Sequence, residues 1–252
     1  MPPKKILIIM SDASTIPLLK TSECGKTTTD QSAGFFLMEL AKPLSKFLSA
    51  GCEVTFASPL GKTPTPDPNS ESLMAFALNF YERQRENDLI ARMKRENGFA
   101  SPRTFQSVSD EELDGFAAVF IPGGHAPLAD LGADPELGRI LAHFHREGKP
   151  TAVICHGPYG LLSTKATPEG TFLYKGYKIT SWSDAEEKMM ETLWGGEVPK
   201  VESTLREAGA EMVEGLGEKI GRITVDRELV SGGNPLAANA LAEQVLKMVE
   251  AQ

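Results

Sequence analysis

Cysteine is scarce in this chain, and its scarcity excludes two classes of protein. The 252 residues contain three cysteines, Cys24, Cys52 and Cys155, with no Cys-x-x-Cys pair among them. An odd number at this spacing predicts neither a disulfide framework nor a structural zinc site. Unpaired thiols are usual in reducing compartments, so we expect a cytoplasmic protein.

Positively charged residues are also fewer than negatively charged ones. The chain has 26 lysines and arginines against 34 aspartates and glutamates, a net charge of -8. Nucleic acids and anionic membrane surfaces require clustered basic residues, so neither is an expected partner. The short basic run at 92–95 is typical of a solvated helix face.

Long apolar runs are missing as well. No segment reaches the roughly 18 apolar residues of a membrane span. The chain begins Met1-Pro-Pro-Lys-Lys and passes directly into a short strand-like run, without an apolar stretch of signal-peptide length. These features favour a globular protein that does not enter a membrane.

What the sequence does contain is a regular alternation of strand-like and helix-like segments. This order predicts an α/β fold in which helices cover both faces of a mostly parallel sheet. The strand-like segments are Ile6–Met10, Glu53–Ala57, Ala117–Ile121, Thr151–Ile154, Lys178–Ser181, Arg222–Asp226 and Leu229–Ser231. The helix-like segments are Ala33–Ala50, Glu136–Glu147, Pro158–Thr164, Asp184–Leu193 and Pro235–Glu250.

One stretch, at about 62–105, interrupts this alternation. Repeated prolines between Pro64 and Pro68 exclude regular structure at its start, and 70–97 then reads as one or two helices. Connections in such folds usually have roughly 2–6 residues. We therefore interpret the chain as a single domain over 1–252 with a cap inserted beside the active site.

The segment that ends in Cys155 is the strongest candidate for chemistry. The apolar strand Thr151–Ile154 is followed at once by Cys155-His156-Gly157-Pro158. A free cysteine is often only a small buried hydrophobe. A sharp strand-to-helix turn, however, places a thiol at a helix N-terminus, where its thiolate is stabilised. We therefore favour the interpretation of Cys155 as a nucleophile over that of a buried hydrophobe.

Two further features point to the same edge of the sheet. Ile121-Pro122-Gly123-Gly124-His125 ends a strand with glycines whose exposed amides could stabilise an oxyanion, although glycine pairs also mark turns without a ligand. Glu39 lies in an apolar helical run. Helical periodicity favours an outward position for it, and the alternative is a buried carboxyl with a raised pKa.

The remaining histidines and cysteines predict no metal site. His143 and His145 are two residues apart on a helix and face different directions, so they cannot easily share an ion. Cys24 lies in a polar loop and reads as an incidental exposed thiol, and Cys52 as a packed one. We expect no metal and no cofactor.

Several separated motifs together resemble the ThiJ/PfpI superfamily, over essentially the whole chain. This resemblance implies a flavodoxin-like sandwich and, in most relatives, a homodimer. Its heat-shock branch includes glyoxalases that need no cofactor. The motifs are 34–39 with Pro43, 57–59 with Gly61-Lys62, 121–125, 152–158 and Gly232-Gly-Asn234-Pro235.

The resemblance also implies roles for individual residues. Cys155 would be the nucleophile, His156 its base and Glu39 a carboxyl touching the thiol, which replaces the outward position favoured by periodicity. The backbone amides of Gly124 and His156 would form the oxyanion site. An acidic residue after the next strand would orient His156. Counting without gaps from Cys155 favours Glu187 for this role, with Asp184 and Glu186 as alternatives.

Three further residues are expected beside the substrate. They are His125, Tyr159 and Asn234.

The function that this branch implies is a glutathione-independent glyoxalase, converting a small 2-oxoaldehyde such as methylglyoxal to lactate. Three alternatives stay open. One is a protein deglycase or a stress-response holdase that binds unfolded clients through apolar residues at 74–81. The second is a cysteine amidase or peptidase, and the third is a redox sensor at Cys155.

Overall fold

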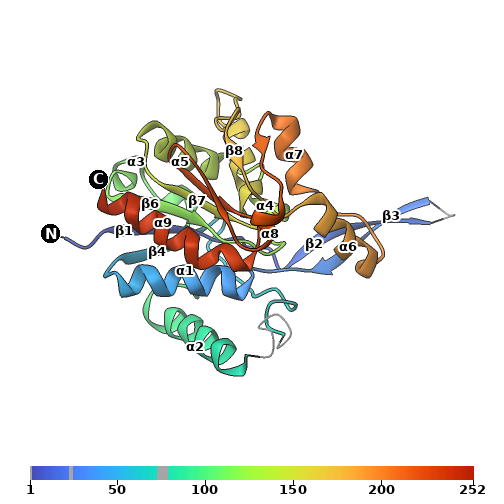
Figure 1. The fold of residues 1–252 in the computed structure, drawn as a ribbon, viewed down its shortest axis with the longest axis horizontal. Coiled ribbons are helices and arrows are strands. Elements are labelled where there is room, and N and C mark those ends of the chain that lie inside the picture. The colour runs from blue at the N-terminus through green and yellow to red at the C-terminus, as the bar shows by residue number, and fades with distance from the viewer. Residues whose placement is uncertain (1, 23–24, 73–78) are drawn as a thin grey trace.

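The centre of the protein is a seven-stranded sheet in the order β10-β11-β7-β6-β1-β4-β5 (Figure 1). The computed structural model describes residues 2–22, 25–72 and 79–252. All neighbouring strands are parallel except β10 and β11. The strands are β1 (Lys5–Ile9), β4 (Glu53–Ser58), β5 (Arg103–Thr104), β6 (Phe116–Ile121), β7 (Thr151–Ile154), β10 (Ile223–Asp226) and β11 (Leu229–Gly232).

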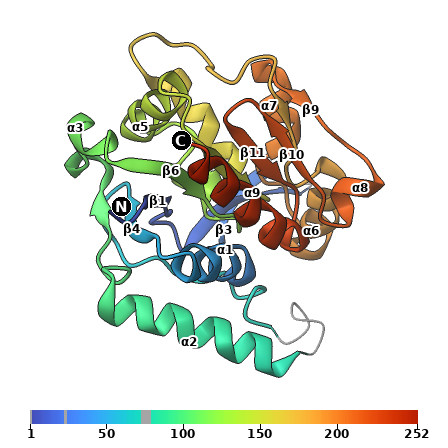
Figure 2. The same cartoon turned by 60° about the vertical axis from the view of Figure 1, so that its left-hand side comes forward.

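The inner strands are apolar along their whole length because both faces of the sheet are covered. In β1, Ile6 and Ile8 enter one core while Leu7 and Ile9 enter the other, as the alternation of side chains along a strand requires. The first core is closed by α1 (Leu37–Ser49) and α9 (Ala238–Glu250). The second is closed by α4 (Pro127–Asp130), α5 (Pro135–Arg146) and the 3-10 helix η2 (Gly157–Ala166) (Figure 2).

This arrangement confirms the predicted α/β class with a mostly parallel sheet. The predicted and observed helices differ in where they begin and in helix type. The helix expected from Ala33 begins at Leu37, because Phe35 is extended and forms a β-bridge with Pro66. The helix expected at 158–164 is a 3-10 helix.

A β-hairpin that the sequence patterns did not predict follows β1. Strands β2 (Thr15–Ser22) and β3 (Gly25–Ser32) pair antiparallel and project away from the body (Figure 1). Near the body, Ile16 and Leu18 are buried, whereas β3 is almost entirely exposed. The loop position expected for Cys24 lies outside the described residues.

The segment interpreted as a cap contributes helix α2 (Phe80–Glu96), which packs along the outer side of α1 (Figures 1 and 2). Its buried residues are Glu86, Ile90 and Met93. Of the apolar stretch at 74–81, positions 74–78 lie outside the described residues. Phe80 and Tyr81 are exposed at 54% and 85%.

The region after β7 adds shorter elements around the sheet edge. They are β8 (Lys178–Ile179), α6 (Asp184–Trp194), α7 (Val201–Ala208), β9 (Glu211–Met212) and α8 (Leu216–Lys219), with α3 (Asp110–Leu113) and the one-turn 3-10 helices η1 (Phe105–Ser107) and η3 (Pro235–Ala237) elsewhere. None of the helices in the described ranges is long and apolar enough to cross a membrane.

Candidate active site

Cys155 lies at a strained turn between β7 and η2. Its φ of 59° is in the left-handed region, which among the non-glycine residues that the structure describes only Arg227 shares. The backbone is held on both sides, since the Cys155 amide donates to the Gly232 carbonyl at 2.8 Å and the Trp182 amide donates to the Cys155 carbonyl at 2.9 Å. A non-glycine residue in this region is strained and persists where the surroundings impose it.

The turn directs the thiol at the adjacent histidine. Sγ of Cys155 lies 3.2 Å from Nδ1 of His156, and Nε2 of His156 lies 2.7 Å from Oε2 of Glu187. All three side chains are buried. Thiol, imidazole and carboxylate thus form a continuous chain of hydrogen bonds, the arrangement in which an imidazole accepts a proton from a nucleophile.

Of the three acidic residues considered for this position, Glu187 is the one whose carboxylate contacts His156. Asp184 instead accepts a hydrogen bond from the Ser203 amide, and Glu186 closes a capping box with Ser183 at the start of α6. The capping box fixes where α6 begins and therefore which residue of its first turn faces the sheet.

The surroundings of Glu187 and His156 define the protonation states of these two groups. Burial raises the pKa of Glu187, but hydrogen bonds from His125 and His156 outweigh this effect and bring it to about 2. Burial, followed by the positive charge of His125, lowers the pKa of His156 to about 4. At neutral pH, Nε2–H of His156 therefore donates to an ionised Glu187, which leaves the Nδ1 lone pair facing the thiol.

Glu39, in the first turn of α1, is fully buried beside the thiol. The outward position favoured by helical periodicity is therefore wrong. An added Cβ at Gly123 would lie 2.3 Å from Oε2 of Glu39 and 2.5 Å from Cβ of Cys155, so only glycine fits between them. Burial raises the pKa of Glu39 to about 8, while contacts with the Cys155 thiol and the charge of His125 lower it.

Two backbone amides face the sulfur. Burial and the charge of Glu39 raise the pKa of the Cys155 thiol well above its ordinary value, and hydrogen bonds from the amides of Gly124 and His156 lower it by less. Gly124 has a φ of 93°, and a Cβ there would lie 2.2 Å from the Gly34 carbonyl oxygen. Amide pairs of this kind stabilise an oxyanion formed next to a nucleophile.

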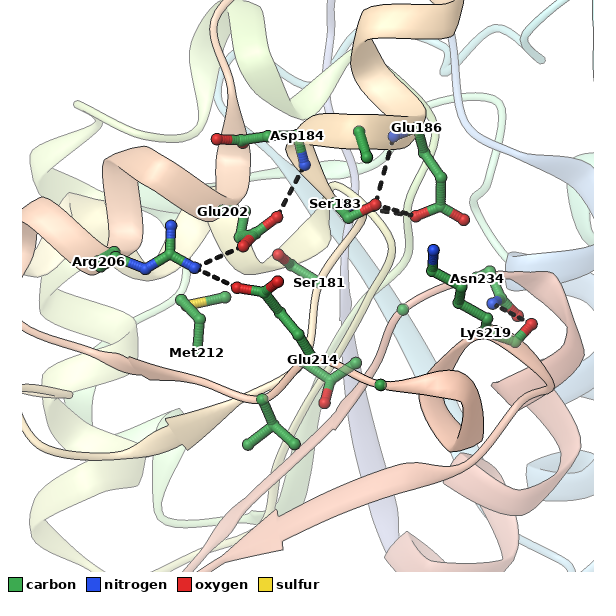
Figure 3. Close-up of a pocket in the computed structure, with 15 residues that line it drawn as sticks. Ser181, Ser183, Asp184, Glu186, Glu202, Arg206, Met212, Glu214, Lys219 and Asn234 are labelled. Atoms are coloured by element: carbon green, nitrogen blue, oxygen red, sulfur yellow. Dashed lines mark hydrogen bonds and ion pairs between the residues drawn. The ribbon is translucent and has the colours of Figure 1, made fainter.

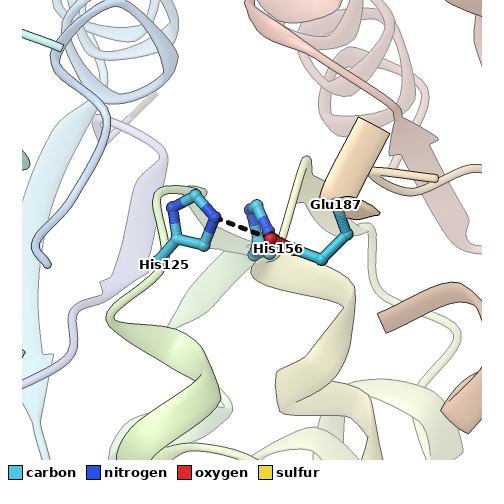
Figure 4. Close-up of side chains that lie close together, drawn as sticks. All are labelled: His125, His156 and Glu187. Carbon is cyan, nitrogen blue, oxygen red and sulfur yellow. Dashed lines mark hydrogen bonds and ion pairs between the residues drawn. The ribbon is translucent and has the colours of Figure 1, made fainter. Parts of the chain in front are cut away.

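His125 lies over His156, with ring centroids 4.0 Å apart. Figure 4 shows the two rings beside the Glu187 carboxylate, and Nε2 of His125 is 3.2 Å from Oε1 of that group. Ligand atoms of these three side chains lie within 4.8 Å of one another. Nε2 of each ring faces an oxygen of the Glu187 carboxylate, so this carboxylate joins the two histidines.

A cavity of about 170 Å³ opens onto the sulfur. It is lined by Phe36, Glu39, Asp67, Asn69, Gly124, His125, Cys155, His156, Trp182, Met190 and Pro235. Six of the residues predicted from the sequence therefore lie together: Glu39, Gly124, His125, Cys155, His156 and, through its contacts, Glu187. The volume suits a molecule of a few carbon atoms.

Two predicted residues lie elsewhere. The Tyr159 ring packs against Gly132 and the second core. Asn234 faces a separate cavity of about 350 Å³ between α6 and α8 (Figure 3), and its amide donates to the Lys219 carbonyl at 3.0 Å. In that cavity Arg206 pairs with Glu202 and Glu214.

The sequence patterns missed several residues of the cavity, chiefly Asp67, Trp182 and Met190. Asp67 stands between two prolines in the segment read only as irregular, and no periodicity marks it. The one available signal was its closeness to the Gly61-Lys62 motif. Trp182 and Met190 carry no local signal, since apolar side chains of this kind usually belong to a core.

A sheet of this topology, with a buried cysteine, histidine and glutamate at the carboxyl end of a central strand, defines an α/β protein with a cysteine-centred site. The chain belongs to the DJ-1/PfpI family, whose family model matches residues 32–248. This match confirms the resemblance inferred from the motifs.

Individual relatives narrow the comparison. The chain is 28% identical to a glutathione-independent glyoxalase of Schizosaccharomyces pombe, over 95% of this chain and 97% of that protein. It is 33% identical to the protein/nucleic acid deglycase HchA of Pseudomonas aeruginosa, over 56% of this chain and 49% of that protein. The crystal structure of glyoxalase III from Candida albicans has the same fold, with a TM-score of 0.76 and 22% identity over 99% of this chain and 98% of that one.

Proposed function

We propose that this protein is a glutathione-independent glyoxalase that converts methylglyoxal, or a similar small 2-oxoaldehyde, to a 2-hydroxy acid. The observation that carries the proposal is the meeting of Cys155, Glu39 and two backbone amides in one small cavity. The similarity to a glutathione-independent glyoxalase over nearly the whole of both chains supports it.

The first step is addition of the thiol to the aldehyde. Nδ1 of His156 takes the thiol proton as Sγ of Cys155 bonds to the aldehyde carbon, forming a hemithioacetal. The amides of Gly124 and His156 hold the developing alkoxide. Because the thiol is neutral at rest, it needs this base at the moment of attack.

The second step moves hydrogen within the bound substrate. With a pKa near 8, Glu39 can give its proton to the alkoxide and then, as a carboxylate, take the proton from C1. That proton is returned to C2, and the hydroxyl proton passes from the C1 oxygen to the C2 oxygen, which leaves a thioester. Water hydrolyses the thioester and releases lactate and the thiol. One carbon is oxidised and its neighbour is reduced, so the reaction needs no external oxidant or reductant.

The test is lactate formation from methylglyoxal by the purified protein, without glutathione. We expect lactate from the wild type and none above background from Cys155→Ala. No lactate from the folded wild type would refute the proposed activity, and lactate from the alanine variant would refute the assigned nucleophile.

A deglycase activity is the second candidate, because the chain is similar to HchA over part of its length. The same thiol could attack the methylglyoxal adduct of a lysine or arginine side chain. Adduct consumption faster than its spontaneous dissociation to free methylglyoxal would support this activity. Adduct consumption at the rate of spontaneous dissociation would contradict a deglycase activity and support the glyoxalase activity only.

The homodimer, the cytoplasmic location and the holdase activity remain predictions.

A further inference from the structure

His125 occupies a position that the proposed reaction does not use. Both of its ring nitrogens face carboxylates, with Nε2 3.2 Å from Oε1 of Glu187 and Nδ1 3.6 Å from Oδ2 of Asp67. The side chain is only 9% exposed. Neither nitrogen is free to bind a substrate, so His125 is placed to act on its neighbours.

Asp67 is held at this position by the backbone of the proline-containing segment. The Phe35 amide donates to the Thr65 carbonyl at 2.9 Å, and the Asp67 amide donates to the Phe35 carbonyl at 2.8 Å. A Cβ at Gly34 would lie 2.4 Å from the Pro66 carbonyl carbon, so the two segments can approach this closely only because residue 34 is glycine.

The Asp67 side chain is itself buried, at 2% exposure. Its Oδ1 accepts a hydrogen bond from the Asn69 amide at 2.9 Å. Its Oδ2 has no hydrogen-bond partner among the described residues and faces the His125 ring. A buried carboxylate without a cation nearby is costly, and the imidazolium form of His125 supplies that cation.

We propose that Asp67 and His125 are positioning residues, in which Asp67 keeps His125 protonated and His125 in turn holds the Glu187 carboxylate against His156. The proposal rests on the proposed roles of Cys155 and His156. The full chain of contacts runs Asp67, His125, Glu187, His156, Cys155.

This arrangement favours the neutral form of His156. An imidazolium 4.0 Å above the His156 ring opposes a second positive charge there, so His156 keeps its lone pair for the thiol. The charged and titratable groups that face His125 are Asp67, Glu187, His156 and, at longer range, Glu39. Burial lowers the pKa of His125, but the two carboxylates raise it to about 9.

The test compares Asp67→Asn with the wild type in two measurements. Nitrogen-15 NMR of the imidazoles reports protonation directly, and the His125→Gln variant identifies the His125 signals among the four histidines. In the wild type we expect His125 to be charged and His156 neutral at pH 7. In Asp67→Asn we expect the His125 titration to fall by about one pH unit or more. The His156 titration should not rise, because His125 stays charged in both proteins near pH 4, where His156 titrates. The alkaline limb of kcat/KM for lactate formation should move to lower pH with the His125 titration, because Glu187 loses its charged partner when His125 loses its proton.

The matched control is Asp134→Asn, the same chemical change at the N-cap of α5, where asparagine caps equally well. It should leave both histidine titrations and the pH profile unchanged. Unaltered titrations in a folded Asp67→Asn protein, with activity merely reduced at every pH, would make Asp67 a structural residue only. A neutral His125 in the wild type at pH 7 would overturn the proposal even if no variant folds. The NMR result does not depend on lactate formation, so a failed glyoxalase assay remains distinguishable.

Discussion

Glu39 and Cys155 influence each other's protonation across the floor of the cavity. The charge of Glu39 raises the pKa of Cys155, after burial the largest cause, while the thiol contact lowers the pKa of Glu39. Both groups are neutral at rest because burial, the largest cause in each case, raises both pKa values. The proposed roles of Glu39 as a proton carrier and of Cys155 as the nucleophile can therefore be tested separately. A neutral residue at position 39 should leave a thiol that can still react.

Glu39→Gln tests that separation. We expect lactate formation to fall by about 10²–10⁴-fold, the usual contribution of a general acid or base. Alkylation of Cys155 by iodoacetamide at pH 8–9 should be as fast as in the wild type or faster, because the pKa of the thiol falls when the carboxylate is removed. Loss of both reactions together would indicate a disturbed turn at Cys155 and not a missing base.

At the scale of elements, α2 rests on α1 through a contact that contains a buried acid. Glu86 is 3% exposed, and neither of its carboxylate oxygens has a hydrogen-bond partner in the described ranges. Burial raises its pKa to about 7, and Lys42 lowers it. A group whose pKa is raised by folding stabilises the fold fully below its unfolded pKa, here 4.5, and this contribution is lost as the pH rises from there through about 7.

Glu86→Gln should therefore have different effects at two pH values. Near pH 4 the glutamate is largely protonated in both the folded and the unfolded protein and resembles glutamine, so urea unfolding of variant and wild type should agree closely. At pH 8 the variant should be more stable by roughly 1–2 kcal/mol, because no charge is buried. An equal difference at both pH values would contradict the buried titrating carboxyl.

Among the strands, those buried on both sides were the most directly predictable. The apolar runs of β1, β6 and β7 identify a covered parallel sheet directly. The hairpin of β2 and β3 escaped detection because β3 is threonine-rich and exposed, without the alternation that marks a half-buried strand. Its structure depends on pairing with β2, which composition does not reveal.

At the scale of the molecule, the site joins segments that are distant in sequence. Cys155, His156 and Gly124 could be predicted because each follows a strand whose end lies at one sheet edge. The resemblance favoured Glu187, but the local pattern alone could not separate it from Asp184 and Glu186, since residues in one helix turn are distinguished only by how the helix packs. Asp67 could not be predicted at all, because its position depends on the bridge between Phe35 and Pro66.

The backbone at Cys155 also sets a limit on how stable this protein can be. A non-glycine residue in the left-handed region costs on the order of 1–2 kcal/mol, and this residue adopts it with a φ of 59°. Glycine would adopt the same turn without strain but would carry no sulfur. Stability alone would therefore favour glycine here, and the cysteine is explained by the chemistry proposed for its sulfur and not by its contribution to the fold.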